Sequence, residues 1–179
     1  VAIGSGVLTG NANVAVGYAS LFSATSADAN VAVGYESMRA STQALDNVAV
    51  GLRALYTNVE GDSNIAIGRE ALYTLDPANG PSYNVAIGDR AGKLMTTGNL
   101  NTLVGGEAGD SYNVAIGDRA GKLITTGVRN TIMGSLAGDA MTTTSDNTAV
   151  GYEALTSATI GNGNVAIGNH ALYTNVAAD

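Results

Sequence analysis

Few residues of this chain have side chains suited to acid–base or nucleophilic catalysis. His170 is the only histidine and there is no cysteine, so a Ser/His/Asp or Cys/His constellation would have to use this one side chain. With one histidine and no cysteine, a zinc site would have too few ligands. His170 occupies a repeat slot that holds Glu36, Arg53 or Glu153 elsewhere, which favours a solvated variable position. We therefore expect no enzymatic activity, no cofactor and no metal site.

Phosphate and calcium binding are the other chemistries that the sequence suggests at first sight. Residues 88–93 and 117–122 both read Gly-Asp-Arg-Ala-Gly-Lys. Three residues rather than four separate their glycines, and Leu94 or Leu123 stands where Ser or Thr would bind magnesium. Both segments are therefore interpreted as turns. The aspartates of the turns lack the spacing of a calcium-binding repeat, so only weak calcium binding stays open. These aspartates are Asp76, Asp89, Asp110, Asp118 and Asp139.

Recognition of a partner by exposed side chains has more support. Two pairs of tyrosines share repeat slots, so neighbouring rings should stack and offer a platform for sugars or a protein receptor. Stacking that only stabilises the repeat is the alternative. The expanded segment 75–81 holds both prolines and should bulge from the repeat array, as insertions in solenoids do. The candidate binding residues are Tyr18, Tyr35, Tyr56, Tyr73, Asp76 and Asn79.

Composition argues against several classes of partner. Eight Lys plus Arg against fifteen Asp plus Glu give a net charge of −7, whereas nucleic acid and anionic membranes need clustered cations. No apolar run approaches the roughly 18 residues that span a bilayer, so we expect no membrane insertion by this segment. With 24 Gly, one Phe and no Trp, the core must pack small residues. The chain begins inside a repeat without Met, as expected for a fragment of a longer protein.

One motif, Asn-Val-Ala-(Val/Ile)-Gly, recurs along the whole chain and positions all of these residues. Most steps between its glycines equal the step from Gly17 to Gly34, and only those that end at Gly17, Gly88 and Gly117 differ. A fixed period of about 17 residues predicts a single repeat array over 1–179. Two segments, 82–98 and 111–127, differ at one position only, which indicates growth by duplication. The motif copies are 1–4, 13–17, 30–34, 47–51, 64–68, 84–88, 101–105, 113–117, 130–134, 147–151 and 164–168.

Each copy predicts a short strand, because β-branched residues such as Val14 and Val16 stand two apart. A turn at Gly17, a second short segment at 19–22 and a polar return at 23–30 would complete one coil. We expect an all-β solenoid, a parallel β-roll of about eleven coils. At about 4.8 Å per coil its length is on the order of 50 Å.

Three columns of the repeat predict how the coils pack. The third motif position is never polar, so Val-Ala-Val is apolar on both strand faces, and we infer that the sheet packs against copies of itself in a homo-oligomer. The small third residue suits either a narrow coil interior or a tight contact between chains. Asn before the strand should form a ladder, and Gly after it allows φ > 0 or close backbone approach. The structural repeat residues are Asn13, Asn30, Asn47, Asn64, Gly17, Gly34, Gly51 and Gly68.

The units at 13–21, 47–55 and 164–172, which read N-V-A-(V/I)-G-x-x-(A/S)-L, resemble the head repeat of the trimeric autotransporter adhesins, the YadA-like family. Related units occur in phage tail fibres. This resemblance implies a left-handed roll, a homotrimer, and a location on the outer surface of the cell or in a virion tail. It also implies a host-cell protein, matrix protein or surface glycan as receptor. The period of this chain is longer than that of the family.

Three other functions remain open at this stage. A phage tail fibre or a purely structural fibre spacer would show the same repeat. A hexapeptide-repeat acyltransferase is a remote enzyme alternative, because its coil of three hexapeptides carries an aliphatic residue every six positions. Here the strong aliphatic signal comes mainly once in each repeat. The sequence therefore favours a non-enzymatic head or shaft of a surface fibre that mediates adhesion.

Overall fold

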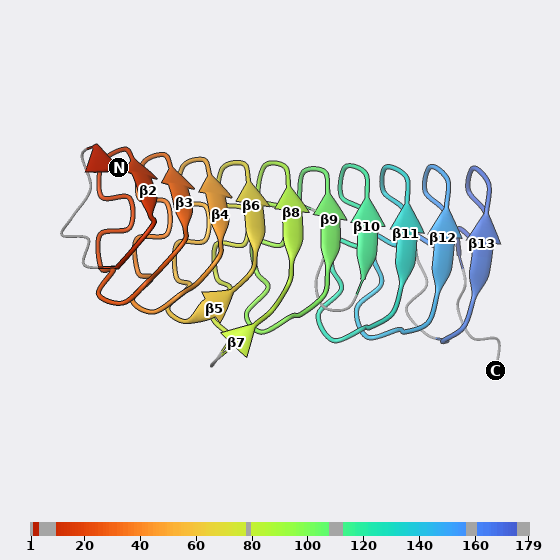
Figure 1. Ribbon diagram of the computed structural model, residues 1–179. Helices are drawn as coiled ribbons and strands as arrows, with labels where there is room; N and C mark the ends of the chain where they lie inside the picture. The colour runs from red at the N-terminus through yellow and green to blue at the C-terminus, as the bar shows by residue number, and fades with distance from the viewer. Residues whose placement is uncertain (1, 4–9, 78–79, 108–112, 157–160, 175–179) are drawn as a thin grey trace.

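A computed structural model describes residues 2–3, 10–77, 80–107, 113–156 and 161–174. These residues contain strands and turns but no helix, and they form an all-β parallel solenoid (Figure 1). Eleven strands form one sheet and two short strands, β5 and β7, form another. The strands are β1 (Ala2–Ile3), β2 (Val14–Val16), β3 (Val31–Val33), β4 (Val48–Val50), β5 (Gly61–Asp62), β6 (Ile65–Ile67), β7 (Gly80–Pro81), β8 (Val85–Ile87), β9 (Thr102–Val104), β10 (Val114–Ile116), β11 (Thr131–Met133), β12 (Thr148–Val150) and β13 (Val165–Ile167).

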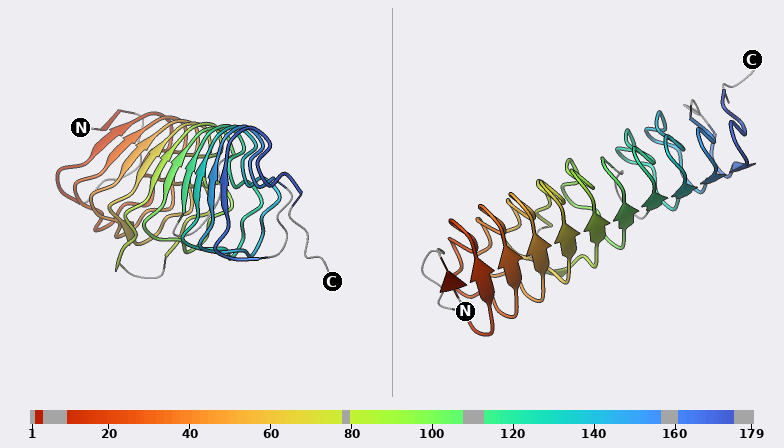
Figure 2. Two further views of the ribbon diagram at one scale, coloured as in Figure 1. Left: turned by 90° about the vertical axis from the view of Figure 1, so that its right-hand side faces the viewer. Right: turned by 90° about the horizontal axis from the view of Figure 1, so that it is seen from above.

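The large sheet pairs each motif with the same motif of the next coil. Ala15 pairs with Ala32, and Ala32 with Ala49, in parallel register. The register is kept where the spacing changes, since Ala66 pairs with Ala86 across the expanded connection. Figures 1 and 2 show the strands side by side along an elongated body, with β1 and β13 at opposite ends. The predicted strand positions and the parallel solenoid are confirmed.

The middle residue of each strand points into the coil. Ala15, Ala32 and Ala49 are fully buried, while the flanking valines are partly exposed. The larger residues at this position, Leu103 and Ile132, are fully buried as well. Of the two places that suit a small third residue, the structure therefore shows the coil interior.

The motif glycines bring neighbouring coils into backbone contact. Gly17 has φ +128°, a conformation that L side chains rarely adopt, and a Cβ built on it would lie 2.5 Å from the carbonyl oxygen of Gly34. Gly51 has φ +136° and would meet the carbonyl of Gly68 in the same way. Both functions expected of the glycine column, positive φ and close approach, therefore occur at the same residues.

In the described coils, the segment that follows the motif glycine is a series of turns. In the first full coil Ala19 has φ 53° and Leu21 has φ 47°, both in the left-handed region. Such values are uncommon for residues other than glycine. Contacts between coils hold them there, because the Leu21 N–H donates to the Ser37 carbonyl at 3.0 Å. These tight turns let one repeat close a complete coil around a narrow core.

Outside the strands, the large core side chains stand at one of two positions of the repeat, four or seven residues after the motif glycine. In the coils of β2, β3 and β4 a Leu or Met stands four residues after the motif glycine, as Leu55 does, and a smaller residue stands at the seventh. In the coil of β11 the fourth residue is Gly138 and the seventh is Met141, which is fully buried. A Cβ on Gly138 would lie 2.8 Å from the Met141 sulfur. The same exchange occurs at Gly121 with Ile124, so the core stays filled along the array.

The expanded segment 75–81 is partly folded against the coils. Leu75 and Pro77 are buried, and Gly80–Pro81 (β7) pairs in parallel with Gly61–Asp62 (β5) at the lower edge of the molecule in Figure 1. Residues 78–79, which would carry the expected outward bulge, lie outside the described part of the chain. The extra length is thus used in part for a second, local strand pair.

Substituting a glycine of the column tests coil contact separately from backbone strain. We expect Gly51→Ala to lower the free energy of unfolding by about 3 kcal/mol or more, because both strain and the collision with Gly68 act. Gly168→Ala is the matched control, with φ +124° and no atom within 4 Å of its added Cβ. It should cost about 1 kcal/mol. Chemical denaturation measures both, and equal losses would contradict the contact.

Candidate functional site

The asparagine column bonds each coil to the next. The Asn47 Oδ1 accepts the backbone N–H of Asn64 at 2.8 Å and its side-chain amide at 3.1 Å. The Asn47 Nδ2 donates to the Asn30 Oδ1 at 3.1 Å and to the carbonyls of Leu45 and Gly61 at 3.0 and 2.9 Å. The predicted ladder is confirmed.

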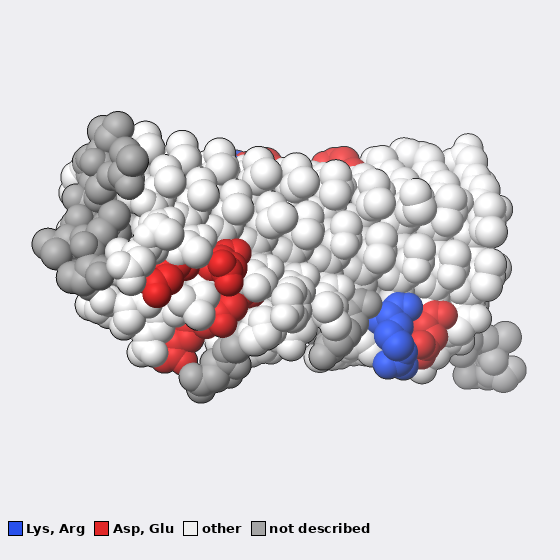
Figure 3. All heavy atoms as spheres, viewed as in Figure 1, with Lys and Arg blue, Asp and Glu red and all other residues white. Residues whose placement is uncertain are grey.

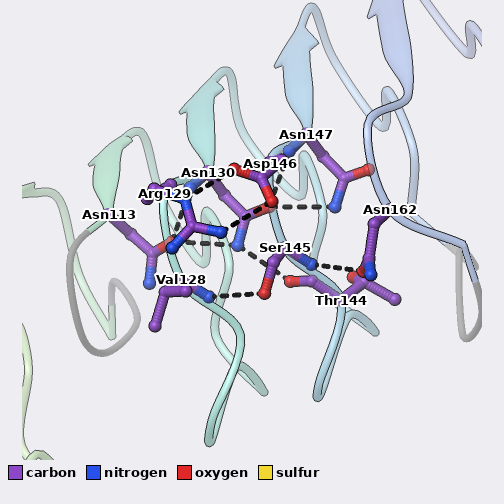
Figure 4. Close-up of polar contacts among 9 residues, drawn as sticks. All are labelled: Asn113, Val128, Arg129, Asn130, Thr144, Ser145, Asp146, Asn147 and Asn162. Atoms are coloured by element: carbon purple, nitrogen blue, oxygen red, sulfur yellow. Dashed lines mark hydrogen bonds and ion pairs between the residues drawn. The ribbon is translucent and has the colours of Figure 1, made fainter.

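The fully buried Asn47 side chain uses both of its polar atoms in these bonds and has none left for a ligand. Figure 4 shows the same arrangement at Asn113, Asn130 and Asn147. The asparagine column is thus a structural element, as are the glycines that follow the strands.

The outer face of the large sheet is uncharged. Among the described residues, Figure 3, viewed onto the strands, shows no Lys, Arg, Asp or Glu over this face, and the charged side chains lie below it and at its upper rim. Two columns of side chains cover it, the first formed by the first residue of each three-residue strand and the second by the third residue. The second column is entirely aliphatic or Met in the described strands, with Ile67 38% exposed. The first column departs from the expected Val or Ile at three strands, where Thr102, Thr131 and Thr148 stand.

The paired tyrosines stack as expected. The rings of Tyr18 and Tyr35 lie 5.2 Å apart at an interplanar angle of 18°, and those of Tyr56 and Tyr73 lie 5.1 Å apart at 7°. In each pair the two rings therefore cover one face of each other. Tyr18 is 67% exposed. The stacking is confirmed, and binding by these rings stays a prediction.

An arginine lies between two of the aromatic rings, which the sequence reasoning missed. The Arg39 guanidinium carbon lies 5.5 Å from the ring centre of Phe22 and 5.9 Å from that of Tyr56. Its Nη1 donates to the Tyr56 hydroxyl at 3.3 Å, and Arg53 lies over the same ring at 5.6 Å. The signal was available, because Phe22, Arg39 and Tyr56 all stand five residues after a motif glycine. Together they form a cationic and aromatic strip on neighbouring coils.

Asp76, the candidate in the expanded segment, is exposed and connects two coils. Its Oδ1 accepts the backbone N–H of Val59 at 3.1 Å. Asp62 accepts from Leu45 in the same way at 2.7 Å. Asp76 therefore has a structural role whether or not it also binds a partner. Asn79 lies outside the described residues.

His170 lies on the surface beside a carboxylate. Its Nε2 is 2.9 Å from Glu153 Oε2, and the rings of Tyr152 and Tyr173 approach it edge-on at 5.6 and 5.5 Å. This is one more contact between equivalent slots of neighbouring coils. Within the described residues there is no group of three His, Cys, Asp or Glu placed to hold a metal ion, and no helix there could span a membrane.

Several carboxylates have a lowered pKa because a cation of another coil binds them. The hydrogen bond from Arg69 lowers the pKa of Asp89 to about 2. The hydrogen bonds from Lys93 and Lys122 likewise lower the pKa values of Glu70 and Glu107. A carboxylate with a lowered pKa in the folded state stabilises the fold above its unfolded pKa, and this stabilisation is lost as the pH falls through the folded value.

These shifts predict an acid-labile array. We expect the melting temperature to stay level between about pH 7 and about pH 5, and to fall between about pH 4.5 and about pH 2 as the paired carboxylates are protonated. Thermal melts by circular dichroism over this range measure it. Asp89→Asn with Glu70→Gln should flatten the acid side of the profile, whereas a stability that rises on acidification would contradict the sign.

Comparison of this chain with protein-family models, with curated proteins and with solved structures finds no match in any of the three. Its functional interpretation therefore depends on the geometry of its own residues.

Proposed function

We propose that this chain is a non-enzymatic segment of an extracellular fibre, a homotrimeric left-handed β-roll that mediates adhesion through repeated surface contacts. The observation that carries the proposal is the uncharged outer face of the large sheet, repeated coil after coil (Figure 3). The resemblance of the repeat units to adhesin heads supports the handedness, the threefold assembly and the location on a cell surface.

The outer sheet face favours association of identical chains. Val33, Val50 and Ile67 stand in register along one column, and the exposure of Ile65 and Ile67 is 37 and 38%. An apolar face of this length is larger than scattered surface hydrophobic residues and marks an interaction site. Closed symmetry is the usual outcome for identical chains. A threefold assembly would place the charged turns outside and the sheets inside.

Adhesion draws support from the side chains that remain outward in such an assembly. The aromatic and cationic strip of Phe22, Arg39 and Tyr56 and the exposed pair Tyr18 and Tyr35 each place side chains on successive coils. Aromatic and arginine side chains are enriched in binding surfaces. Three chains would present three such surfaces, and weak contacts would add to firm retention by multivalency. Host-cell protein, matrix protein or surface glycan is the receptor class.

A structural spacer, in a bacterial or phage fibre, is the second candidate. The observation that favours it is that one face of each paired ring is used in stacking between coils, because that face cannot also stack on a sugar.

The assembly is tested by sedimentation of the purified chain. We expect the mass of a trimer, and we expect Val33→Glu to shift the mass toward monomer because it puts a charge into the apolar column. Leu94→Glu is the control, since Leu94 is 74% exposed and lies in the turns. It should leave the mass unchanged. A soluble and folded wild-type monomer at all concentrations would contradict the assembly.

Retention assays separate adhesion from a spacer role. The immobilised segment should retain cells, matrix proteins or surface glycans, and the double variant Tyr18→Ala/Tyr35→Ala should lose at least about tenfold in retention, as the removal of a hot spot does. Tyr83→Ala is the matched control, because Tyr83 is 56% exposed outside the tyrosine pairs. Absence of retention by the wild-type trimer would favour the spacer.

A further inference from the structure

One surface column of the array carries charges of alternating sign. The column is formed by the residue two places after each motif glycine. Its first two residues in the sequence, Gly6 and Ala19, are uncharged, and the next six alternate acid and base without exception: Glu36, Arg53, Glu70, Arg90, Glu107 and Arg119.

Backbone geometry holds these residues in line. Arg53 has φ 55° and Glu70 has φ 54°. Each donates its N–H to the residue that follows the motif glycine of the preceding coil, Arg53 to the Tyr35 carbonyl at 2.9 Å and Glu70 to the Leu52 carbonyl at 2.8 Å. The column is therefore a regular feature of the fold, and the sign of its charge is the part that the sequence varies.

Opposite charges meet along this column. Glu36 Oε2 lies 2.8 Å from Arg53 Nε, and Arg90 Nη1 lies 3.0 Å from Glu107 Oε1. Arg53 also helps to lower the pKa of Glu70, after the larger effects of Lys93 and Arg69.

A neighbouring column five places after the glycine extends the pattern. Glu70 binds Lys93 of the following coil at 2.7 Å, Glu107 binds Lys122 at 2.6 Å, and Arg119 binds Asp139 at 2.9 Å. In each case the residue two places after the glycine of one coil binds an opposite charge five places after the glycine of the next coil. The contacts of Glu70 and Glu107, two coils apart, therefore repeat the same arrangement.

Two irregularities of the sequence agree with a period of two coils. The duplicated segments 82–98 and 111–127 carry the motif glycines Gly88 and Gly117, which are two coils apart, so the copy preserved the alternation. The alternation changes phase once, between Arg119 and Glu153, and the slot between them holds the uncharged Leu136. A charge of either sign at 136 would meet one like-charged neighbour.

We propose that the column is an electrostatic register device, in which each charged coil is stabilised by opposite charges on both neighbours. A misfolded array that skips one coil would stack like charges on each other, whereas the correct stacking places opposite ones together. An exposed ion pair contributes little alone, but a ladder acts at every coil. The asparagine and glycine columns hold the same residue from coil to coil and cannot distinguish one coil from the next, whereas the charged column can.

The phase change at Leu136 allows a direct test. Leu136→Glu and Leu136→Arg are each made in the wild-type chain and in a second background, Glu153→Arg/His170→Glu, where position 136 lies between two arginines. In the wild-type chain the two variants should melt within about 1 °C of each other, because each gains one favourable and one unfavourable neighbour. In the second background the glutamate variant should melt about 3 to 6 °C above the arginine variant, as expected for several weak pairs changing together.

The comparison between backgrounds removes effects of Asp139 and of the lost leucine, since both are the same in the two backgrounds. In about 1 M salt the Debye length is about 3 Å, so the charges are screened and the preference for glutamate should disappear. A difference between the glutamate and arginine variants that is the same in both backgrounds at low salt would overturn the proposal. All variants are surface changes, and sedimentation of each confirms that the assembly state is unchanged.

Discussion

The contact between motif glycines of neighbouring coils is the constraint on which the rest of the structure depends. At Gly17 a Cβ would lie 2.5 Å from the next glycine's carbonyl oxygen, and the backbone has a positive φ that glycine adopts without strain. Once these backbones touch, the strands can pair only motif to motif. The asparagines then face each other across the coil spacing, and each large core residue must fit between the layers above and below it.

Much of the fold could be predicted from the sequence because the repeat exposes it. A β-branched pair two residues apart marks the strand, and the constant Asn and Gly positions mark the columns. The left-handed turns could not be predicted in the same way, because residues such as Glu36 and Leu55 do not favour positive φ by themselves. The replacement of Leu by Gly92, Gly121 and Gly138 in one slot was the available signal. The turn conformation of the expected second segment at 19–22 also needed the structure, because hydrogen bonds between coils override local preference there.

Some contacts of the candidate site could be predicted from the sequence, and others could not. The stacking of Tyr18 on Tyr35 follows from shared slots at the coil spacing. The position of Arg39 between Phe22 and Tyr56 needed the alignment of unlike residues in one slot, which a search for repeated residue types does not find. The direction of the strand side chains also needed the structure, since an apolar middle residue is compatible with either face of the sheet. With the alanines inside, the outer columns remain as the surface for assembly.

The asparagine amides offer the most direct test of the stacked-coil account. The backbone N–H of Asn30, Asn47 and Asn64 each donates to the side-chain oxygen of the preceding asparagine, so their exchange with solvent reports on the ladder itself. Hydrogen exchange resolved by residue should show these amides exchanging only through global unfolding, with protection that is similar from coil to coil. Rapid exchange of the asparagine amides in a folded chain would contradict the account.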